Sequence, residues 1–402
     1  MGGNVLIEMQ RLSNPAKPLL DFGEILCISP DEWVRREELE EITYNDDFFS
    51  QEKAKNLTFD HIVSLRNAYG DALSCSFRLG ELPVLNICQD TNEESLRDFL
   101  DTIEDSPTVV FNFMLNKKQL VESWLEVVPS YHIYLYLFPN SLENFLSSNL
   151  SSLEKSLWPS KLETDYKVIF LIPNREIWLD GSYLALIGGK HIAHLKDLIS
   201  KPLQNTNEPQ DMYEICQKNL KWQIPWLKQL TPLHLNVKEI VPSDDIITKM
   251  LMIHQINSII LYTADRTIGD KNKPTVSTYS GANQSVELTL LAPKDTIDKD
   301  LLSCVSSLMK MLEWTYNSTW SADRIPLVQI GVAQALYAAS PFLRYQLLLH
   351  NAKNIFEGLK WHWKAFIENK VDSYVSQIQA LEDYVADTVQ EFADQISDMI
   401  KK

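Results

Sequence analysis

The last stretch of the chain carries its longest regular hydrophobic pattern. From Val371 onward, apolar residues recur every three or four positions, which is the spacing of one face of an α-helix. The stripe consists of Val371, Tyr374, Ile378, Leu381, Val385, Val389, Phe392, Ile396 and Met399. Two consecutive steps of four perturb the seam of a regular coiled coil. A single helix over 371–402 would be about 48 Å long, so we expect its stripe to form an interface.

A second pattern covers residues 81–200, where strand-like runs alternate with helical stretches. The runs are rich in Val, Ile, Phe and Tyr and lie at Leu82–Cys88, Thr108–Met114, His132–Phe138 and Lys167–Ile172. Capping-box spacings start the intervening helices at Thr91, Asn116 and Asn140. This alternation predicts an α/β domain with a mainly parallel sheet and flanking helices.

The region before this domain, residues 1–80, reads as a mixed N-terminal segment. Val5–Met9 and Glu24–Ile28 are predicted to be short strands. Ser29 is predicted to cap a helix, because Pro30 follows it and Glu32 stands three residues later. The acidic residues of this helix indicate a solvated face, with a docking patch for a basic partner as the alternative.

After the α/β domain we expect three further parts. Asp180-Gly181 marks a hairpin turn between two short strands, and the polar residues 200–215 open a linker with short helices over 201–242. Residues 243–295 are predicted to form a helix followed by a small β-meander, with strands at Ser258–Thr263, Thr275–Tyr279 and Ser285–Leu291. Residues 296–402 are predicted to be helical and to end in the long amphipathic helix.

The charge and composition restrict the possible partners. An apolar content of 45% in 402 residues is that of a globular protein, and the formal net charge of −17 disfavours non-specific binding of nucleic acid. Five widely spaced cysteines fit a reducing compartment, so we expect a cytoplasmic protein. No secretory signal and no long apolar run are present. A membrane contact is expected only if the native chain extends past Lys402.

Sequence motifs for catalysis and cofactor binding are missing. The chain has no Gly-rich dinucleotide loop, P-loop, HExxH or GxSxG motif, so no cofactor is expected. His191 and His194 are three residues apart but lack further ligands at a suitable spacing, and no metal site is predicted. Cys88 and His132 would lie at opposite ends of neighbouring parallel strands, which argues against a nucleophilic pair.

One weaker ligand site is predicted at the carboxyl ends of the parallel strands, where ligands gather in open α/β sheets. The polar residues there are Asp90, Asn116, Lys117, Asn140, Asn174 and Arg175. Lys117 and Arg175 could hold an anion near a helix N-terminus, and Asp90 could accept a proton. The alternative is that these residues are helix caps and solvated loop residues.

Two functional hypotheses follow from these patterns. The preferred one is a non-enzymatic regulatory or interaction protein, in which an α/β sensing or docking domain is coupled to an associating terminal helix. Its partner would be another protein or a second copy of the chain. The alternative is a hydrolase that acts on a nucleotide or phosphorylated substrate at the strand ends, with Asp90, Lys117 and Arg175 as its first candidates.

Overall fold

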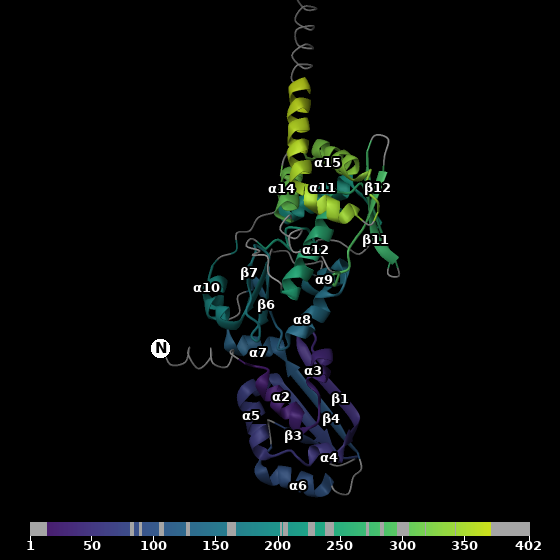
Figure 1. The fold of residues 1–402 in the computed structure, drawn as a ribbon. Coiled ribbons are helices and arrows are strands. Elements are labelled where there is room, and N and C mark those ends of the chain that lie inside the picture. Colours follow the sequence, from purple (N-terminus) through teal and green to yellow (C-terminus); the bar gives the residue numbers. More distant parts are fainter. Residues whose placement is uncertain are drawn as a thin grey trace, which may run out of the picture.

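The computed structural model describes residues 14–80, 84–87, 91–103, 108–125, 129–158, 166–201, 203, 208–223, 230–237, 245–270, 273–281, 285–295, 305–317, 319–341 and 343–370. The described elements form an elongated body, with the N-terminal elements at one end and the C-terminal helices at the other (Figure 1). The predicted strand Val5–Met9 and the predicted interface stripe from Val371 to Met399 lie outside the described residues.

The N-terminal end of the body is built on an antiparallel sheet. Its strands are β1 (Glu41–Ser50), β2 (Leu73–Arg78), β3 (Leu85–Ile87) and β4 (Thr108–Asn116), in the order β1-β4-β2-β3. The helical elements around it are α2 (Lys17–Ile25), α3 (Pro30–Arg36), α4 (Gln51–Ala54), α5 (Phe59–Tyr69), the 3-10 turn η1 (Gly70–Ala72) and α6 (Glu93–Ile103). Phe111 and Phe113 of β4 pack against Phe22 of α2 in the core.

The antiparallel pairing in this sheet shows that the prediction of a mainly parallel sheet is wrong for its first two strands. The runs predicted at Leu82–Cys88 and Thr108–Met114 correspond to β3 and β4, and both pair antiparallel with β2. In β4 the residues from Val109 to Leu115 alternate between buried and less buried positions. Such alternation is typical of a sheet covered on one face, whereas strands of a parallel sheet are apolar on both faces.

A second sheet lies in the middle of the body. It contains β5 (Tyr131–Leu135), β6 (Lys167–Ile172), β7 (Trp178–Asp180) and β8 (Leu184–Gly188), in the order β5-β6-β8-β7. Strands β5, β6 and β8 are parallel, and β7 pairs antiparallel with β8 through the predicted Asp180-Gly181 turn. Around this sheet follow α7 (Lys117–Trp124), α8 (Pro139–Leu146), α9 (Leu150–Leu157), the 3-10 turn η2 (Gly189–His194) and α10 (Leu195–Ile199).

Strand β6 is buried along its whole length and belongs to two hydrophobic cores. Val168, Phe170 and Ile172 point into the core shared with the C-terminal helices. Ile169 and Leu171 point the opposite way, into the core shared with the N-terminal sheet. Successive side chains of a strand face opposite sides, so this one strand connects the two halves of the molecule.

The C-terminal end combines helices with a third sheet. Its elements are α11 (Glu208–Asn219), β9 (Lys221–Gln223), α12 (Ile246–Thr263), β10 (Arg266–Asp270), β11 (Lys273–Ser280), β12 (Ser285–Thr289), α14 (Val305–Tyr316) and α15 (Ser321–Leu336), followed by a helix over residues 344–370. The sheet order is β12-β11-β10-β9, antiparallel except for the parallel pair β9 and β10. The predicted strands Thr275–Tyr279 and Ser285–Leu291 correspond to β11 and β12, whereas β10 lies in none of the predicted strands.

Two predictions for this region are wrong. Ser258–Thr263, predicted to be a strand, forms the last turns of α12, which is buried on nearly all sides. A helix that is apolar on all sides lacks the periodic pattern of apolar and polar residues that would distinguish it from a buried strand. The polar segment 200–215, predicted to be a loop or linker, becomes helical at Glu208, where α11 begins, although short helices were expected within 201–242.

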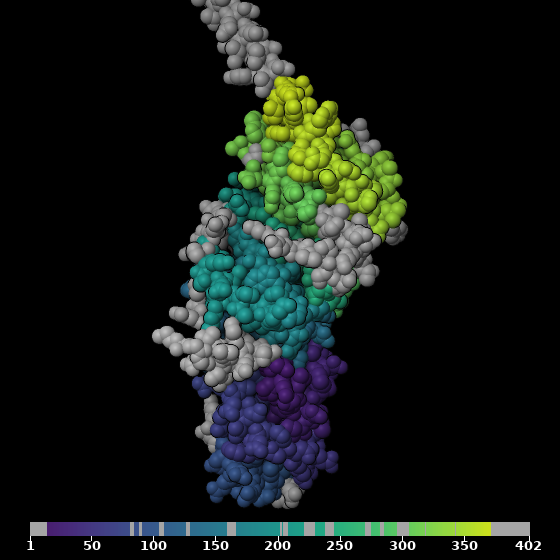
Figure 2. Space-filling model, turned by 60° about the vertical axis from the view of Figure 1, so that its left-hand side comes forward, coloured from purple at the N-terminus to yellow at the C-terminus, as the bar shows by residue number. Residues whose placement is uncertain are grey.

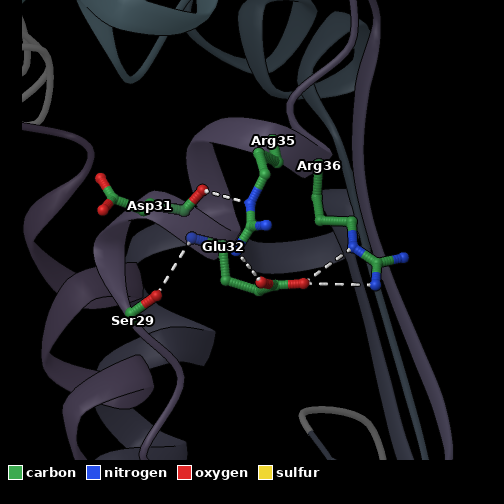
Figure 3. Close-up of polar contacts among 5 residues, drawn as sticks. All are labelled: Ser29, Asp31, Glu32, Arg35 and Arg36. Carbon is green, nitrogen blue, oxygen red and sulfur yellow. Dashed lines mark hydrogen bonds and ion pairs between the residues drawn. The ribbon is translucent and has the colours of Figure 1, made fainter.

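The predicted helix starts are partly confirmed. Ser29 caps α3 as expected, and its Oγ accepts the Glu32 N–H at 3.3 Å (Figure 3). Asn116 caps α7 by accepting the Gln119 N–H at 2.9 Å. The cap predicted at Thr91 lies one residue later, at Asn92, whose Oδ1 accepts the Ser95 N–H.

Two other local predictions near helix ends are wrong. Asn140 lies inside α8, because that helix already begins at Pro139, which suits the first helical position. Glu24–Ile28 is the end of α2 and a turn instead of a strand; Cys27 there has a φ of 52°. The described chain thus has mixed helices and strands, parallel and antiparallel pairings, and a helical C-terminal region, and a mainly parallel sheet is not confirmed.

Candidate functional site

Lys117, which was predicted to hold an anion, is already paired with a carboxylate. It lies in the first turn of α7, directly after β4, and its side chain is 1% exposed. Its Nζ lies 3.0 Å from Glu37 Oε1 and donates to the Glu38 carbonyl oxygen at 2.5 Å. The same Nζ lies 4.4 Å from the centre of the Tyr136 ring. Burial lowers the pKa of Lys117, and the neighbouring Glu37 opposes this by raising it.

Glu37 closes the carboxyl end of the central sheet. Its two carboxylate oxygens accept the backbone N–H groups of Leu137 at 2.7 Å and Phe138 at 3.0 Å, where the chain leaves β5 and enters α8. This is the place where open α/β sheets bind anionic ligands, at strand ends and helix N-termini. In this protein a carboxylate of the chain itself takes that place, with Lys117 as its counter-ion.

Arg175 and Asn174, which follow β6, also have structural partners. The Arg175 guanidinium lies 2.8 Å from Glu143 of α8 and 2.5 Å from Asp245, the residue that caps α12. Asn174 Nδ2 donates to the Leu137 carbonyl oxygen at 3.0 Å. These contacts fix the loop after β6 to α8 and α12.

The predicted ligand residues are thus brought only partly together. Lys117 and Asn174 both contact the segment around Leu137 at the carboxyl end of β5, and Arg175 lies beside Asn174 in the chain. Asn140 is exposed on α8, and Asp90 lies outside the described residues. Asn116 is a helix cap, as the alternative interpretation predicts. Both predicted anion-binding cations already hold carboxylates, which weakens the hydrolase hypothesis.

Glu37 was not identified from the sequence. It stands in an acidic stretch with Glu38, Glu40 and Glu41, and that stretch is typical of a solvated face. Only burial distinguishes Glu37 from these neighbours, since its side chain is 0% exposed. No local pattern predicts which carboxylate of an acidic run turns inward, because its partners lie about a hundred residues away.

The acidic face of α3 is largely neutralised by its own arginines. The Glu32 carboxylate lies 2.6 Å from Arg35 and 3.3 Å from Arg36 (Figure 3). The Arg36 guanidinium also lies over the Tyr44 ring, at 5.2 Å from its centre. These contacts favour a solvated helix face over a docking patch for a basic partner.

A cavity of about 780 Å³ lies at the amino ends of the parallel strands, between the central sheet and the C-terminal helices. Lys167 at the start of β6 forms an ion pair there with Asp180 of β7. Tyr131 donates its hydroxyl to the Lys201 carbonyl oxygen at 2.6 Å. The volume is that of a small-molecule site. The described residues that line the cavity include no histidine and no cysteine, and therefore no Cys–His pair of nucleophile and base.

The two histidines considered as metal ligands lie in η2 and contact an aromatic ring. The ring centres of His191 and His194 lie 5.8 Å and 6.1 Å from that of Trp178. His191 Nε2 is 3.9 Å from a carboxylate oxygen of Glu176. In the described part of the chain, no three His, Cys, Asp or Glu side chains are grouped so that they could hold a metal ion.

The helix over residues 344–370 is buried in its first half only. Its inner face contributes Tyr345, Leu348, Leu349, Ala352, Ile355 and Leu359 to the C-terminal core. From residue 360 to residue 370, no residue of this helix is buried. Trp361 is 69% exposed and Phe366 is 39% exposed. Figure 2 shows the helix at one tip of the elongated body.

Two cation–aromatic contacts hold the outer half of this helix to the body. The Arg324 guanidinium of α15 contacts the rings of both Trp314 and Trp363, at 4.5 Å and 4.9 Å from their centres. Lys370 Nζ lies 5.4 Å from the ring centre of Trp320, which precedes α15, and 3.6 Å from Asp323 of α15. Such contacts are directional and partly exposed. Together with the contacts of the Trp363 ring with the rings of Trp314 and Trp320, they hold a half of the helix that contains no buried residue.

None of the described helices combines the length and the apolar character that crossing a membrane requires. Comparisons of the chain with protein-family models, with curated proteins and with solved structures give no match.

Proposed function

We propose that this protein is a non-enzymatic regulatory or interaction protein that acts through its C-terminal helix. The observation that carries the proposal is the loss of burial along the helix over 344–370. Its inner face is buried as far as Leu359, none of residues 360–370 is buried, and the Trp361 and Phe366 side chains are exposed. Exposed aromatic residues beside cations are typical of contact surfaces between proteins.

By sequence spacing alone, the apolar stripe predicted from Val371 follows in line with the buried face of this helix. Leu359 is followed on the same face by Trp363 and Ile367, and the steps of three and four then lead on to Val371. None of residues 360–370, which precede the stripe, is buried, so we infer that the stripe needs a partner to cover it. A second copy of the chain would offer the same stripe, and we therefore propose self-association along this helix.

The carboxyl end of the central sheet supports a structural role for the α/β unit. The positive groups at this end, Lys117 and Arg175, are paired with carboxylates of the chain. An anionic substrate would have to displace Glu37 from two backbone N–H groups and from Lys117. Such displacement would expose buried charges at a high cost.

The test is the mass of the protein in solution, measured by light scattering after gel filtration. The full chain should have a multiple of the monomer mass, and deletion of Val371–Lys402 should reduce it to that of the monomer. Ile378→Asp in the full chain should have the same effect, because it places a charge in the stripe. Ser376→Asp, on the opposite face of the predicted helix, is the matched control and should leave the mass unchanged.

The deletion must leave the rest of the protein folded for this test to count. Circular dichroism and thermal unfolding of the shortened chain should match those of the full chain apart from the helical signal of the deleted residues. A full chain that is already a monomer, with an Ile378→Asp variant identical to it, would contradict the proposal.

A further inference from the structure

Strand β5 is an edge strand, and its outer side has no partner strand among the described residues. The sheet order places β5 at the end of the row, beside β6 only. An open strand edge presents backbone N–H and C=O groups that can pair with a further strand, and proteins usually cover or blunt such edges. The outer side of β5 is therefore a site for strand addition.

The hydrogen bonds to β6 identify the groups that face outward. The Lys167 N–H donates to the Ser130 carbonyl oxygen at 2.9 Å, and the Tyr136 N–H donates to the Leu171 carbonyl oxygen at 2.8 Å. Alternate residues of a strand direct their backbone groups to the same side, so the even-numbered residues bond to β6. The N–H and C=O groups of Tyr131, Ile133 and Leu135 consequently point to the outer side.

A groove of about 430 Å³ runs along this edge. Its floor is β5, from Tyr131 to Leu135, and one wall is the α7 face that carries Lys118, Val121 and Glu122. Leu39 and Ser156 also contribute to its lining. Leu39 and Ile133, which are half-buried, supply apolar surface inside the groove, as a bound strand with apolar side chains would require.

The groove is closed at one end by the buried pair described above. Glu37 accepts the Leu137 N–H, which is the next outward-facing donor after Leu135. Lys117, the counter-ion of Glu37, is itself part of the groove lining. A strand added to β5 would thus bond with Tyr131, Ile133 and Leu135 and end before Leu137.

We propose that the segment Val5–Met9 of this chain occupies the groove as an added strand beside β5. Its sequence, Val-Leu-Ile-Glu-Met, is the strand predicted from the N-terminal pattern. In an extended conformation, Val5, Ile7 and Met9 share one side and supply an apolar face for the wall formed by Val121.

The position of the first described residues supports this occupant. The Pro15 carbonyl oxygen accepts the Tyr69 hydroxyl at 2.6 Å, at the end of α5. The next element, η1, packs against α7, the helix that forms the groove wall. The residues from Met9 to Asn14 span about 16 Å when extended, which exceeds the diameter of about 10 Å of one helix. The described chain therefore starts beside elements that pack against α7, and the extended N-terminal residues are long enough to pass across one helix.

Hydrogen exchange at single amides tests the proposal on the full chain and on a variant that lacks residues 1–13. In the full chain the outward amides of Tyr131, Ile133 and Leu135 should be protected. In the shortened chain they should exchange at least tenfold faster, while the inward amides of His132 and Tyr134 keep their protection through β6. Equal exchange at the outward amides in both proteins would overturn the proposal.

A peptide of residues 1–13 provides the second measurement. It should bind the shortened chain in a saturable manner and restore protection at the three outward amides, and it should bind the full chain at least tenfold more weakly. The peptide with Ile7→Asp should lose binding, and the peptide with Gln10→Asp, outside the strand, is the matched control. Failure of the unmodified peptide to bind a shortened chain that keeps its inward amides protected would contradict the proposal.

This inference is independent of self-association by the C-terminal helix. Deletion of Val371–Lys402 should leave the exchange of the β5 amides unchanged, and deletion of residues 1–13 should leave the mass of the assembly unchanged. A shortened chain in which inward and outward amides lose protection equally, and in which the peptide restores neither, would also count against the added strand.

Discussion

The buried pair of Glu37 and Lys117 is the most consequential contact of single side chains in this protein. Both side chains are almost completely buried, and together they connect the segment before β1, the start of α7 and the end of β5. Buried charges are costly when they lose a partner, whereas exposed pairs contribute little. The contact therefore fixes the N-terminal sheet to the central sheet. Each of its two buried charges depends on the other for neutralisation.

Replacing Lys117 tests this dependence. Lys117→Met keeps most of the side-chain volume but leaves the Glu37 carboxylate buried without its cation. We expect the free energy of unfolding to fall by about 3–5 kcal/mol, measured by urea denaturation at pH 7. Glu32→Gln, which breaks the more exposed pairs with Arg35 and Arg36, is the control and should cost less than about 1 kcal/mol. Similar small losses in both variants would show that Lys117 contributes no more than a surface charge.

Two buried histidines predict a loss of stability in mild acid. Burial lowers the pKa values of His234 and His254 to about 4, although hydrogen bonds to backbone groups of Thr231 and Leu146 oppose the shift. In the unfolded chain a histidine has a pKa of about 6.5. Between these values the unfolded state binds a proton that the folded state does not, so stability falls as the pH decreases from about 6.5 toward 4.

The variant His254→Gln isolates one of these contributions. Between pH 7 and pH 5 the unmodified protein should lose about 2 kcal/mol more stability than the variant, because the variant has one fewer buried group to protonate on unfolding. Denaturant unfolding at a series of pH values measures the difference. Parallel pH profiles for the two proteins would mean that His254 is protonated as readily in the folded state as in the unfolded state.

At the scale of residues, helix caps were predictable and buried partners were not. Ser29 and Asn116 could be identified because a cap bonds to a residue three positions later in the chain. Glu37 bonds to Leu137 and Phe138, and Arg175 bonds to Glu143 and Asp245. Partners at such separations leave no local pattern, so Lys117 and Arg175 were interpreted as possible ligand groups.

At the scale of elements, the helix over 344–370 depends on Arg324 for the position of its outer half. Arg324 contacts the rings of Trp314 and Trp363 and donates from Nη1 to the Trp314 carbonyl oxygen at 2.6 Å. Its replacement by methionine removes the cation and this bond while keeping a long side chain. We expect faster hydrogen exchange over residues 360–370, with 345–359 unchanged because that half is held by the core.

A matched variant at the other end of the helix controls this prediction. Arg344 donates from Nη1 to the Glu287 carbonyl oxygen at 3.1 Å, so Arg344→Met should affect the first turn and leave residues 360–370 unchanged. Exchange measured by mass spectrometry distinguishes the two ends of the helix. Unchanged exchange over 360–370 in the Arg324→Met protein would show that the contacts of Arg324 with the two tryptophan rings do not hold this half of the helix.

Elements with one buried face were easier to predict than elements buried on all sides. Residues 296–402 were predicted to be helical, and α14 and α15 confirm this for their part of the segment, with Leu308 and Leu312 buried in α14 and Val328 and Val332 in α15. In α12 the residues from Ile247 to Thr263 are buried almost without interruption, and its last turns were mistaken for a strand. Hydrophobic periodicity is lost when every side of a helix contacts protein.

At the scale of the whole molecule, strand pairing was the main information missing from the sequence. β1 and β4 pair between Glu41 and Asn116, and β2 pairs with both β3 and β4. Strands from the predicted segment 1–80 therefore share a sheet with strands from the predicted α/β domain. Each strand can be recognised locally, but its neighbour is selected by the packing of the entire N-terminal core.

The burial of β6 between two cores has a consequence for unfolding. Loss of one core would expose half of the side chains of β6 to water. The other core would then be packed against a strand whose opposite face is solvated. Neither half of the molecule should persist without the other, so the described body should melt as one cooperative unit. Calorimetry should give a single transition with equal calorimetric and van't Hoff enthalpies. Val168→Ala and Ile169→Ala, on opposite faces, should lower its midpoint together, whereas two resolved peaks would reveal independently melting halves.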